Sequence, residues 1–343
     1  MTGVWLALGL PVLAGLVLLA CYVLDKFTRV RGTMRLFHLF EPFGYTQAQM
    51  GNLEGKQFVV TGGNSGLGLA TVKLLAQAGG NVVLACRNTT LGETAKRAIG
   101  TTKGTIVVME LDLADLKSVK RFSNAFKQLK LPLHSLVLNA GVMMCPFELT
   151  KDGIESQFGV NHVGHFALAK DLVDVLEQTK QSSVVSVSSV AHWFPVPGGV
   201  YLNLDDINDE AKYSPGTWYG QSKLANLLFA REFAKRYPKV LCNAVHPGGV
   251  QGNLNRHLVG GNSILSLVDL VAQGVFYWPG ETAALTSVAA AVGVLETKTT
   301  GKYFVPIARL DDGSELSRND QLASKVWEFT EQLLKSKSYD SFQ

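Results

Sequence analysis

Residues 58–80, FVVTGGNSGLGLATVKLLAQAGG, constrain the fold of this chain more than any other segment. A short apolar run, typical of a buried strand, leads into a glycine-rich turn, and the turn leads into a helical pattern. Gly62, Gly66 and Gly68 let the backbone adopt positive φ and approach a diphosphate at the N-terminus of that helix. Because a second apolar run follows, the segment predicts a strand–turn–helix–strand unit that binds a dinucleotide.

Apolar runs of strand length recur along the rest of the chain, and helical patterns separate most of them. This alternation is typical of the α/β class. We therefore predict a single Rossmann-type, doubly wound parallel sheet of about seven strands, preceded by an N-terminal transmembrane helix. The runs lie at residues 58–61, 81–86, 105–111, 135–139, 183–188, 240–245 and 302–305.

The N-terminal segment explains much of the chain's apolar composition. Residues 4–24 are 21 residues without a charge, long enough to span a bilayer as a helix. Residues 25–35 carry a net charge of +3 out of +4 for the whole chain, which places the C-terminal side in the cytosol. Two alternatives stay open. One is a cleaved signal peptide, which the lack of charge before the run disfavours, and the other is a monotopic or hairpin insertion at Pro11.

The apolar runs and the charge distribution divide the chain into four predicted parts. The remainder beyond the basic flank is almost neutral and shows no internal repeat or second-domain linker. The parts are a transmembrane anchor (1–25), a basic and aromatic juxtamembrane connector (26–52), a nucleotide-binding domain (53–310) and a C-terminal helical extension (311–343).

A second apolar stretch lies late in the predicted domain. Residues 264–278 are nearly all apolar, with Asp269 as the single charge, and are too few to span a bilayer comfortably. We predict that residues 258–280 form an apolar lid over a pocket for a lipophilic ligand. An ordinary buried helix is the alternative.

Charge and cysteine usage exclude several classes of protein. A net charge of +4 over 343 residues argues against a nucleic-acid partner. The four cysteines lie far apart without a CxxC pair, so a disulfide framework or a zinc site is not expected. His162, His165 and His192 are not spaced as zinc ligands, and we predict no metal.

The residues that follow the second apolar run favour one nicotinamide cofactor over the other. A protein that binds NAD places an acidic residue there to hold the ribose 2′-hydroxyl. Cys86 occupies that place and Arg87 follows, and a guanidinium suits a 2′-phosphate. The sequence therefore favours NADP(H), with a solvated surface arginine as the alternative for Arg87.

Tyr219 and Lys223 are candidates for proton transfer. They stand at positions i and i+4 of a helical pattern and share a face. A tyrosine has an ordinary pKa near 10, and we expect the nearby ammonium to lower the pKa of Tyr219 towards neutrality. Ser189 ends a strand-like run, where its hydroxyl can hold a substrate oxygen, with Ser188 as the alternative.

Seven motifs occur along the chain in a fixed order. They are TGGNSGLG (61–68), LDLAD (111–115), LNAG (138–141), GVNHVGHF (159–166), VVSVSS (184–189), YGQSK (219–223) and HPGGV (246–250). Together they resemble the short-chain dehydrogenase/reductase superfamily over roughly residues 53–310. The segments NAGVMMCP and NHVGHF resemble in particular the membrane-linked retinol dehydrogenase and WW-domain oxidoreductase group.

The resemblance implies roles for individual residues. It makes Tyr219 the general acid and base, has Lys223 bind the nicotinamide ribose, and has Asn161 hold a water in a proton relay. Asp112 resembles an adenine-contacting aspartate, with a helix N-cap as the alternative, and Asn139 is expected to tie neighbouring strands together. The implied catalytic residues are Asn161, Ser189, Tyr219 and Lys223. The implied cofactor-binding residues are Gly62, Asn64, Ser65, Gly66, Leu67, Gly68, Arg87, Asp112, Leu113, Asn139, Ala140, Gly141, Tyr219, Lys223, Pro247, Gly248 and Val250.

The expected activity follows from the same resemblance. It is a membrane-anchored, NADP(H)-dependent enzyme that interconverts a lipophilic alcohol with its aldehyde or ketone, such as a retinoid, steroid or fatty aldehyde. The expected location is the endoplasmic reticulum membrane, with the enzyme domain in the cytosol, and a homo-oligomer is compatible with the family. Gly252 stands where relatives often carry Thr or Ser, so that cofactor contact is not expected.

Two alternative functions stay open at the level of the sequence. The first is an enzyme resembling protochlorophyllide reductase, whose family shares the fold and the Tyr/Lys pair. The second is a scaffold that binds the cofactor without turnover. The N-terminal apolar run and the motifs that resemble retinol dehydrogenases disfavour the first. The complete set of implied catalytic residues, Asn161, Ser189, Tyr219 and Lys223, disfavours the second.

Overall fold

The computed structural model describes residues 44–250, 277–293 and 299–341. The predicted anchor at 1–25, most of the connector and all but the last four residues of the predicted lid lie outside the described residues. None of the helices in these described ranges is long and apolar enough to cross a bilayer.

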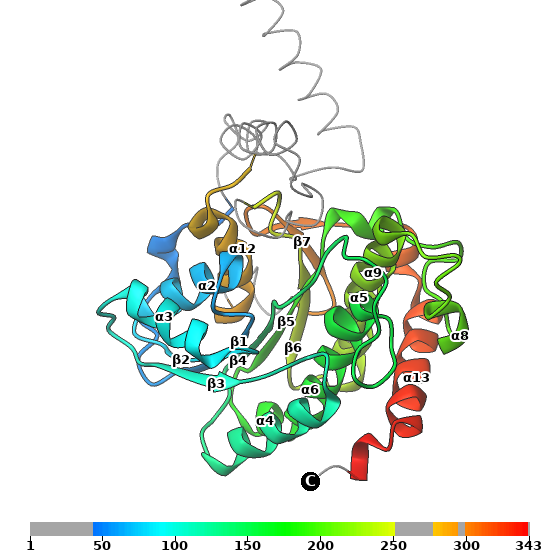
Figure 1. Ribbon diagram of the computed structural model, residues 1–343. Coiled ribbons are helices and arrows are strands. Elements are labelled where there is room, and N and C mark those ends of the chain that lie inside the picture. Colours follow the sequence, from blue (N-terminus) through cyan, green and yellow to red (C-terminus); the bar gives the residue numbers. More distant parts are fainter. Residues whose placement is uncertain (1–43, 251–276, 294–298, 342–343) are drawn as a thin grey trace, which may run out of the picture.

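An eight-stranded sheet forms the centre of the described fold, with strand order β3-β2-β1-β4-β5-β6-β7-β8 (Figure 1). The order reverses between β1 and β4, as in doubly wound folds. All neighbouring pairs from β3 to β7 are parallel, and β8 pairs antiparallel with β7. The strands are β1 (Gln57–Thr61), β2 (Asn81–Cys86), β3 (Ile106–Glu110), β4 (Ser135–Leu138), β5 (Ser183–Val187), β6 (Leu241–Val245), β7 (Tyr303–Val305) and β8 (Arg309–Asp311).

The predicted Rossmann-type sheet is confirmed. Each of the observed strands β1 to β7 coincides with one of the seven apolar runs that predicted a strand. Strand β8 is an addition to that prediction. Its three residues, Arg-Leu-Asp, are too few and too polar to show the alternation that marks a strand. It forms because the chain turns back at once after β7 and pairs with it at the edge of the sheet.

Helices cover both faces of the sheet, which is the usual arrangement for parallel strands (Figure 1). One face packs against α2 (Gly66–Gln77), α3 (Thr89–Ile99) and α12 (Gly280–Val292). The other packs against α4 (Leu116–Gln128), α6 (Gly164–Asp171) and α9 (Pro215–Arg236). The shorter described helices are η2 (Gln47–Met50), α5 (Ser156–Phe158), η3 (Gly159–Val163), α7 (Val173–Gln178), η4 (Val190–Trp193), α8 (Leu204–Ile207), η6 (Leu316–Arg318) and η7 (Tyr339–Ser341).

Strand β1 shows how the two cores are separated. Phe58 and Val60 belong to the core under α2 and α12, whereas Val59 belongs to the core under α4 and α9. Successive side chains of a strand point to opposite faces, and both faces here are covered. The strand is therefore buried along its whole length and reads as a continuous apolar run.

The C-terminal helix α13 (Asp320–Ser336) lies within the segment predicted as a helical extension, and it packs along α9 (Figure 1). Its Trp327 is fully buried, with its ring centre 4.6 Å from that of Phe166 and 5.9 Å from that of Phe229. The helix thus completes the core beneath α9 and supports the residues that α9 carries.

Candidate active site

The candidate site lies where the parallel strands end. Strands β1, β4, β5 and β6 run parallel, so their C-terminal ends lie on the same side of the sheet, beside the point where the strand order reverses. Ligands of doubly wound folds bind at this edge. The predicted site residues in the described ranges follow the strand ends or lie on helices α2 and α9 and in the π-helical turn η3.

The glycine-rich turn after β1 needs its glycines for two different reasons. Gly62 and Gly66 have φ of +65° and +51°, in the left-handed region that side chains disfavour. A Cβ on Gly68 would collide with the carbonyl oxygen of Gly62 and with the Asn139 side chain. The turn can therefore pack closely against the loop that follows β4.

The first turn of α2 is open to a ligand. Ser65 is the N-cap residue, but its side chain makes no capping hydrogen bond, and both Ser65 and Gly66 are exposed. The first backbone N–H groups of a helix have no partner within the helix and attract anions. The open turn and its glycines thus fit the diphosphate of a dinucleotide. Asn64 and Leu67 flank it, each half-buried.

Thr61, the last residue of β1, joins the two halves of the sheet. Its hydroxyl accepts hydrogen bonds from the backbone N–H groups of Asn139 and Ala140, each at 2.9 Å. The Asn139 side chain in turn donates to the Thr61 carbonyl oxygen at 2.8 Å. Thr61 is not among the predicted site residues, although a polar residue at the end of an apolar run is a signal that the sequence offers.

The end of β2 carries no acidic residue. Arg87 is exposed immediately after the strand, and Asn88 caps α3 by accepting from the Leu91 backbone N–H. Cys86 is buried, and its thiol donates to the Asn88 carbonyl oxygen at 3.2 Å. Burial raises the pKa of that thiol, so Cys86 acts as a small core residue.

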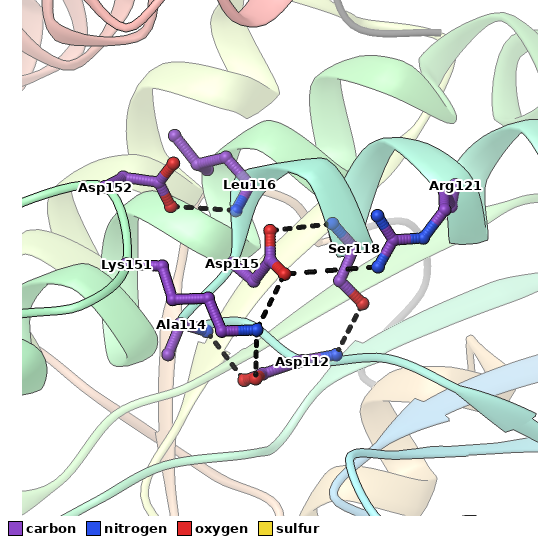
Figure 2. Close-up of polar contacts among 8 residues, drawn as sticks. All are labelled: Asp112, Ala114, Asp115, Leu116, Ser118, Arg121, Lys151 and Asp152. Carbon is purple, nitrogen blue, oxygen red and sulfur yellow. Dashed lines mark hydrogen bonds and ion pairs between the residues drawn. The ribbon is translucent and has the colours of Figure 1, made fainter.

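Asp112 lies in a polar cluster at the start of α4 (Figure 2). Its side chain accepts from the Ala114 backbone N–H at 3.0 Å, and its other oxygen lies 3.8 Å from the Lys151 Nζ. The residue that caps α4 is Asp115, which accepts from the Ser118 backbone N–H at 3.1 Å. Asp112 is therefore not the helix cap, whereas its neighbour Leu113 is buried in the core.

Tyr219 and Lys223 are both buried on α9, 5% and 4% exposed, and the Lys223 Nζ lies 5.5 Å from the centre of the Tyr219 ring. The Ser189 side chain lies close enough to the Tyr219 phenol to lower its pKa. Lys223 donates to the Val187 carbonyl oxygen at 3.1 Å. The structure thus brings the predicted serine, tyrosine and lysine together at the end of β5.

The predicted direction of the Tyr219 pKa shift is wrong for this structure. Burial raises the pKa of Tyr219 to about 12, and the hydrogen bond from Ser189 offsets this only in part. Burial also lowers the pKa of Lys223 to about 8. Removing both groups from water disfavours the phenolate and the ammonium, and this burial is the largest cause of both shifts.

The two candidate serines differ in what their hydroxyls contact. The Ser188 hydroxyl donates to the Lys223 carbonyl oxygen at 2.7 Å and is buried against α9. The Ser189 hydroxyl accepts from the Ala191 backbone N–H at 3.2 Å and contacts Tyr219. Ser189 is therefore the hydroxyl that faces the tyrosine.

Asn161 is fully buried in η3 and uses its side chain to position the loop after β4. Its amide accepts from the Val142 N–H at 2.9 Å, and donates to the Val142 carbonyl and the Ser222 hydroxyl, each at 3.0 Å. Its backbone carbonyl lies 3.0 Å from the His165 Nδ1. Both amide hydrogens of Asn161 are therefore engaged, so a relay water could bind Asn161 only as a hydrogen-bond donor to one of its oxygens.

Three histidines near the site are engaged separately. His162 bonds to Thr330, His165 to Thr61, and His192 to the Ser189 carbonyl oxygen. Within residues 44–250, 277–293 and 299–341, no three His, Cys, Asp or Glu side chains are grouped to hold a metal ion.

The loop after β6 carries the remaining cofactor candidates. His246 is buried, and Pro247 and Gly248 follow it, the latter with φ of +84° against the Trp278 ring. Val250 pairs with Trp278, and the backbone N–H of Trp278 donates to the Gly249 carbonyl oxygen at 2.7 Å. The two ends that flank residues 251–276 therefore lie together at the site, whereas Gly252 lies outside the described residues.

Gln157 is a further residue that sequence reasoning missed. Its amide donates to the Tyr213 hydroxyl at 2.8 Å and to the Pro215 carbonyl oxygen at 3.0 Å, and it accepts from the Met144 N–H at 2.9 Å. These bonds fix Met144 beside Gly216, at the start of the helix that carries Tyr219. No motif spacing signals this role.

The joint at Thr61 gives a stability prediction. In Thr61→Val the Ala140 N–H and the His165 ring nitrogen lose a partner at the centre of the fold, so we expect the free energy of unfolding to fall by about 2 kcal/mol or more. Thr71→Val is the matched control, because among the described residues the buried Thr71 hydroxyl bonds only to the Leu67 carbonyl of its own helix, and it should cost less than about 1 kcal/mol. Urea unfolding measures both, and equal losses would contradict the role of Thr61.

Comparison with known proteins identifies the family to which this chain belongs. A family model described as short chain dehydrogenase matches residues 56–201. Retinol dehydrogenase 12 of Homo sapiens is 39% identical over 286 residues, covering 82% of this chain and 87% of its own length. Short-chain dehydrogenase TIC 32 A, chloroplastic, of Brassica napus is 38% identical over 291 residues, covering 81% and 88%.

A solved structure agrees with these relatives. The crystal structure of an uncharacterized protein from Mycobacterium paratuberculosis is 34% identical, with a TM-score of 0.67, and covers 85% of this chain and 98% of that one. Fold, motif order and relatives therefore lead to one conclusion. The chain belongs to the short-chain dehydrogenase/reductase family, is similar to its retinol dehydrogenases, and is an oxidoreductase that acts on CH–OH groups.

Proposed function

We propose that this chain is a membrane-anchored, NADP(H)-dependent oxidoreductase that interconverts a lipophilic alcohol with its aldehyde or ketone, with Tyr219 as general acid and base. The observation that carries the proposal is that Ser189, Tyr219 and Lys223 come together at the C-terminal ends of the strands, beside the open glycine-rich turn, with the Ser189 hydroxyl close to the buried Tyr219 phenol. Two hydroxyls that meet in a buried site can hold one carbonyl oxygen between them.

In the reductive direction, the Tyr219 phenol donates its proton to the substrate oxygen, and Ser189 donates a hydrogen bond to the same oxygen. When bound, the nicotinamide supplies the hydride to the carbonyl carbon. The high pKa of Tyr219 keeps the phenol protonated at neutral pH, as a proton donor requires. In the oxidative direction, the same phenol must first lose its proton, with Lys223 beside it to stabilise the phenolate.

Lys223 can donate hydrogen bonds to a ligand. Its ammonium carries three N–H donors, and one of them donates to the Val187 carbonyl oxygen. A Cβ on Gly141 would lie 3.5 Å from the Lys223 Nζ, so the lysine reaches the loop after β4, where the resemblance places the cofactor. We assign its other donors to ribose hydroxyls of the nicotinamide half.

The preference for NADP(H) rests on the end of β2. Arg87 is exposed at the position that faces the adenosine ribose in this fold, and no acidic residue takes the place of Cys86. A guanidinium forms strong, charge-assisted bonds with a 2′-phosphate. The diphosphate of the same cofactor would rest on the open first turn of α2.

Apolar side chains near Tyr219 favour a lipophilic substrate. Met144 is held against Gly216 at the start of α9, three residues before Tyr219, and Cys145 is buried beside it. Phe194, which follows the turn after Ser189, is 59% exposed. Relatives of this chain are named retinol dehydrogenases 11, 12 and 14, which favours a retinoid-type alcohol or aldehyde.

The proposed location rests on the sequence. An uncharged run at residues 4–24 with a basic flank after it supports a single-pass anchor with the enzyme domain in the cytosol, and we propose the endoplasmic reticulum as its membrane. A location at the membrane surface would bring the site close to a substrate that dissolves in lipid.

Tyr219→Phe tests the proposed chemistry. We expect kcat for the reduction of all-trans-retinal by NADPH to fall by about 10³-fold, because the proton donor is lost, with the Kd for NADPH unchanged. Tyr237→Phe, at the far end of the same helix, is the control and should retain full turnover. Retained turnover in Tyr219→Phe would contradict the proposal. NADPH binding without turnover by the unaltered enzyme, over a panel of lipophilic carbonyls, would favour the scaffold alternative.

Arg87→Ala tests the cofactor preference. The loss of charge-assisted hydrogen bonds to the 2′-phosphate should raise the Kd for NADPH by about ten- to a hundredfold and leave the Kd for NADH unchanged. Arg97→Ala, an exposed arginine on α3, serves as the control. An equal effect on both cofactors would show that Arg87 does not read the phosphate.

The pH dependence of turnover should follow the ionisation of the Lys223 ammonium. Its pKa is lowered to about 8, so the ammonium is present below that pH and is lost as the pH rises through it. We expect kcat/KM for NADPH to fall above about pH 8, since a neutral amine binds ribose hydroxyls more weakly. Tyr219 stays protonated in this range and does not set the decline. A flat profile up to pH 10 would contradict this assignment.

A further inference from the structure

His192 connects the proposed substrate-binding serine to a distant part of the chain. It lies in η4, the turn that follows Ser189, and is fully buried. Its Nδ1 lies 2.7 Å from the Ser189 carbonyl oxygen. On the other side of the ring, Nε2 accepts a hydrogen bond of 3.2 Å from the backbone N–H of Ser314. Both ring nitrogens are therefore engaged.

These partners fix the protonation state of the ring. The Ser314 backbone N–H can only donate, so the His192 Nε2 must be the acceptor. The Ser189 carbonyl can only accept, so Nδ1 must carry the proton. Protonation of Nε2 would set two N–H groups against each other in a buried place. Burial indeed lowers the pKa of His192 to about 4.

The surroundings of His192 favour the neutral ring as well. His246, after β6, is close enough to interact electrostatically, and its own pKa is also lowered by burial. The Tyr303 ring of β7 packs edge-on with its centre 5.2 Å from that of His192. Asp311 of β8 acts in the opposite sense and raises the pKa of His192, but burial outweighs it.

Ser189 depends on this ring for its position. Its carbonyl oxygen accepts both the Nδ1 proton and the His192 backbone N–H, the latter at 3.1 Å. Its hydroxyl lies at the N-cap of η4 and accepts from the Ala191 backbone N–H. The carbonyl and the hydroxyl are thus fixed by the same turn, and His192 links that turn to the rest of the fold.

The other end of the link is a hydrogen-bonded turn after β8. Within it the Gly313 N–H donates to the Asp311 side chain at 2.8 Å, and the Ser317 hydroxyl donates to the Ser314 carbonyl oxygen at 2.7 Å. The Ser317 N–H also donates to the Ser314 hydroxyl at 3.2 Å. The short edge strand β8 and this turn together hold the Ser314 N–H in place.

We propose that His192 is a positioning residue of the reaction, a neutral imidazole that sets the place of the Ser189 hydroxyl by linking its turn to the turn after β8. The proposal rests on the proposed role of Ser189 in holding the substrate oxygen. It makes the segment after β7 a support of the site rather than an appendage to the fold.

Two amide substitutions separate the two halves of the link. His192→Asn places an amide N–H near the position of Nδ1 and keeps a donor for the Ser189 carbonyl. His192→Gln extends its amide towards the position of Nε2 and keeps a partner only for Ser314. With all-trans-retinal and NADPH in detergent, we expect kcat to stay within about threefold in His192→Asn and to fall about tenfold or more in His192→Gln. The KM for NADPH should not change in either variant.

A double-mutant cycle with Ser189→Ala shows whether His192 acts through the serine. Ser189→Ala alone should lower kcat by about 10²-fold, as expected when one hydrogen-bond donor to the reacting oxygen is lost. In the Ser189→Ala background, His192→Gln should lower kcat by less than about twofold. A tenfold further loss there would overturn the proposal and show a merely structural effect.

Two controls keep the test decisive. His134→Asn removes a half-buried imidazole that accepts from the Gln57 N–H before the start of β4, away from the site, and should leave kcat unchanged. Full activity in Ser189→Ala, or no turnover by the unaltered enzyme, would refute the proposed function instead. Nitrogen NMR of the histidine-labelled enzyme reports the ring independently of activity. A His192 proton on Nδ1 at pH 7 is expected, and a proton on Nε2 would overturn the proposal.

Discussion

The joint between β1 and β4 is the contact on which the rest of the site depends. The strand order reverses there, and the fully buried hydroxyl of Thr61 accepts from the backbone of the loop that follows β4. The same hydroxyl contacts His165 at 2.8 Å, and His165 contacts the carbonyl oxygen of Asn161. One threonine thus fixes the glycine-rich turn, the loop after β4 and η3 relative to one another.

Burial then determines the chemistry of the residues on α9. Tyr219 and Lys223 lie beneath the strand ends, with the core around Trp327 behind their helix. Desolvation raises the pKa of the phenol and lowers that of the amine, so both groups are closer to neutral than they would be in water. Such a pair is suited to donate a proton to a carbonyl oxygen. For oxidation of an alcohol, the bound substrate and cofactor must supply interactions that stabilise the Tyr219 phenolate against the cost of burial.

Much of the fold could be predicted from the sequence, because periodicity and glycine spacing are local signals. The seven parallel strands followed from them, whereas the grouping of Ser189 with Tyr219 was implied by the resemblance of the ordered motifs to the short-chain dehydrogenase/reductase superfamily. Strand β8 could not be predicted, since its three residues have no apolar pattern and form a strand only by pairing with β7. The pKa shift of Tyr219 was predicted in the wrong direction because burial is a property of the whole fold. Thr61 and Gln157 carry no motif, and only their partners in space reveal them.

The central claim is that the site around Ser189 and Tyr219 transfers a hydride between a nicotinamide and a lipophilic carbonyl. NADPH deuterated at both hydrogens of carbon 4 tests this most directly, because the result does not depend on which face of the ring reacts. After incubation with all-trans-retinal and the detergent-solubilised enzyme, mass spectrometry of the product should show retinol with one deuterium at the alcohol carbon. Unchanged retinal, or retinol without deuterium, would contradict the claim.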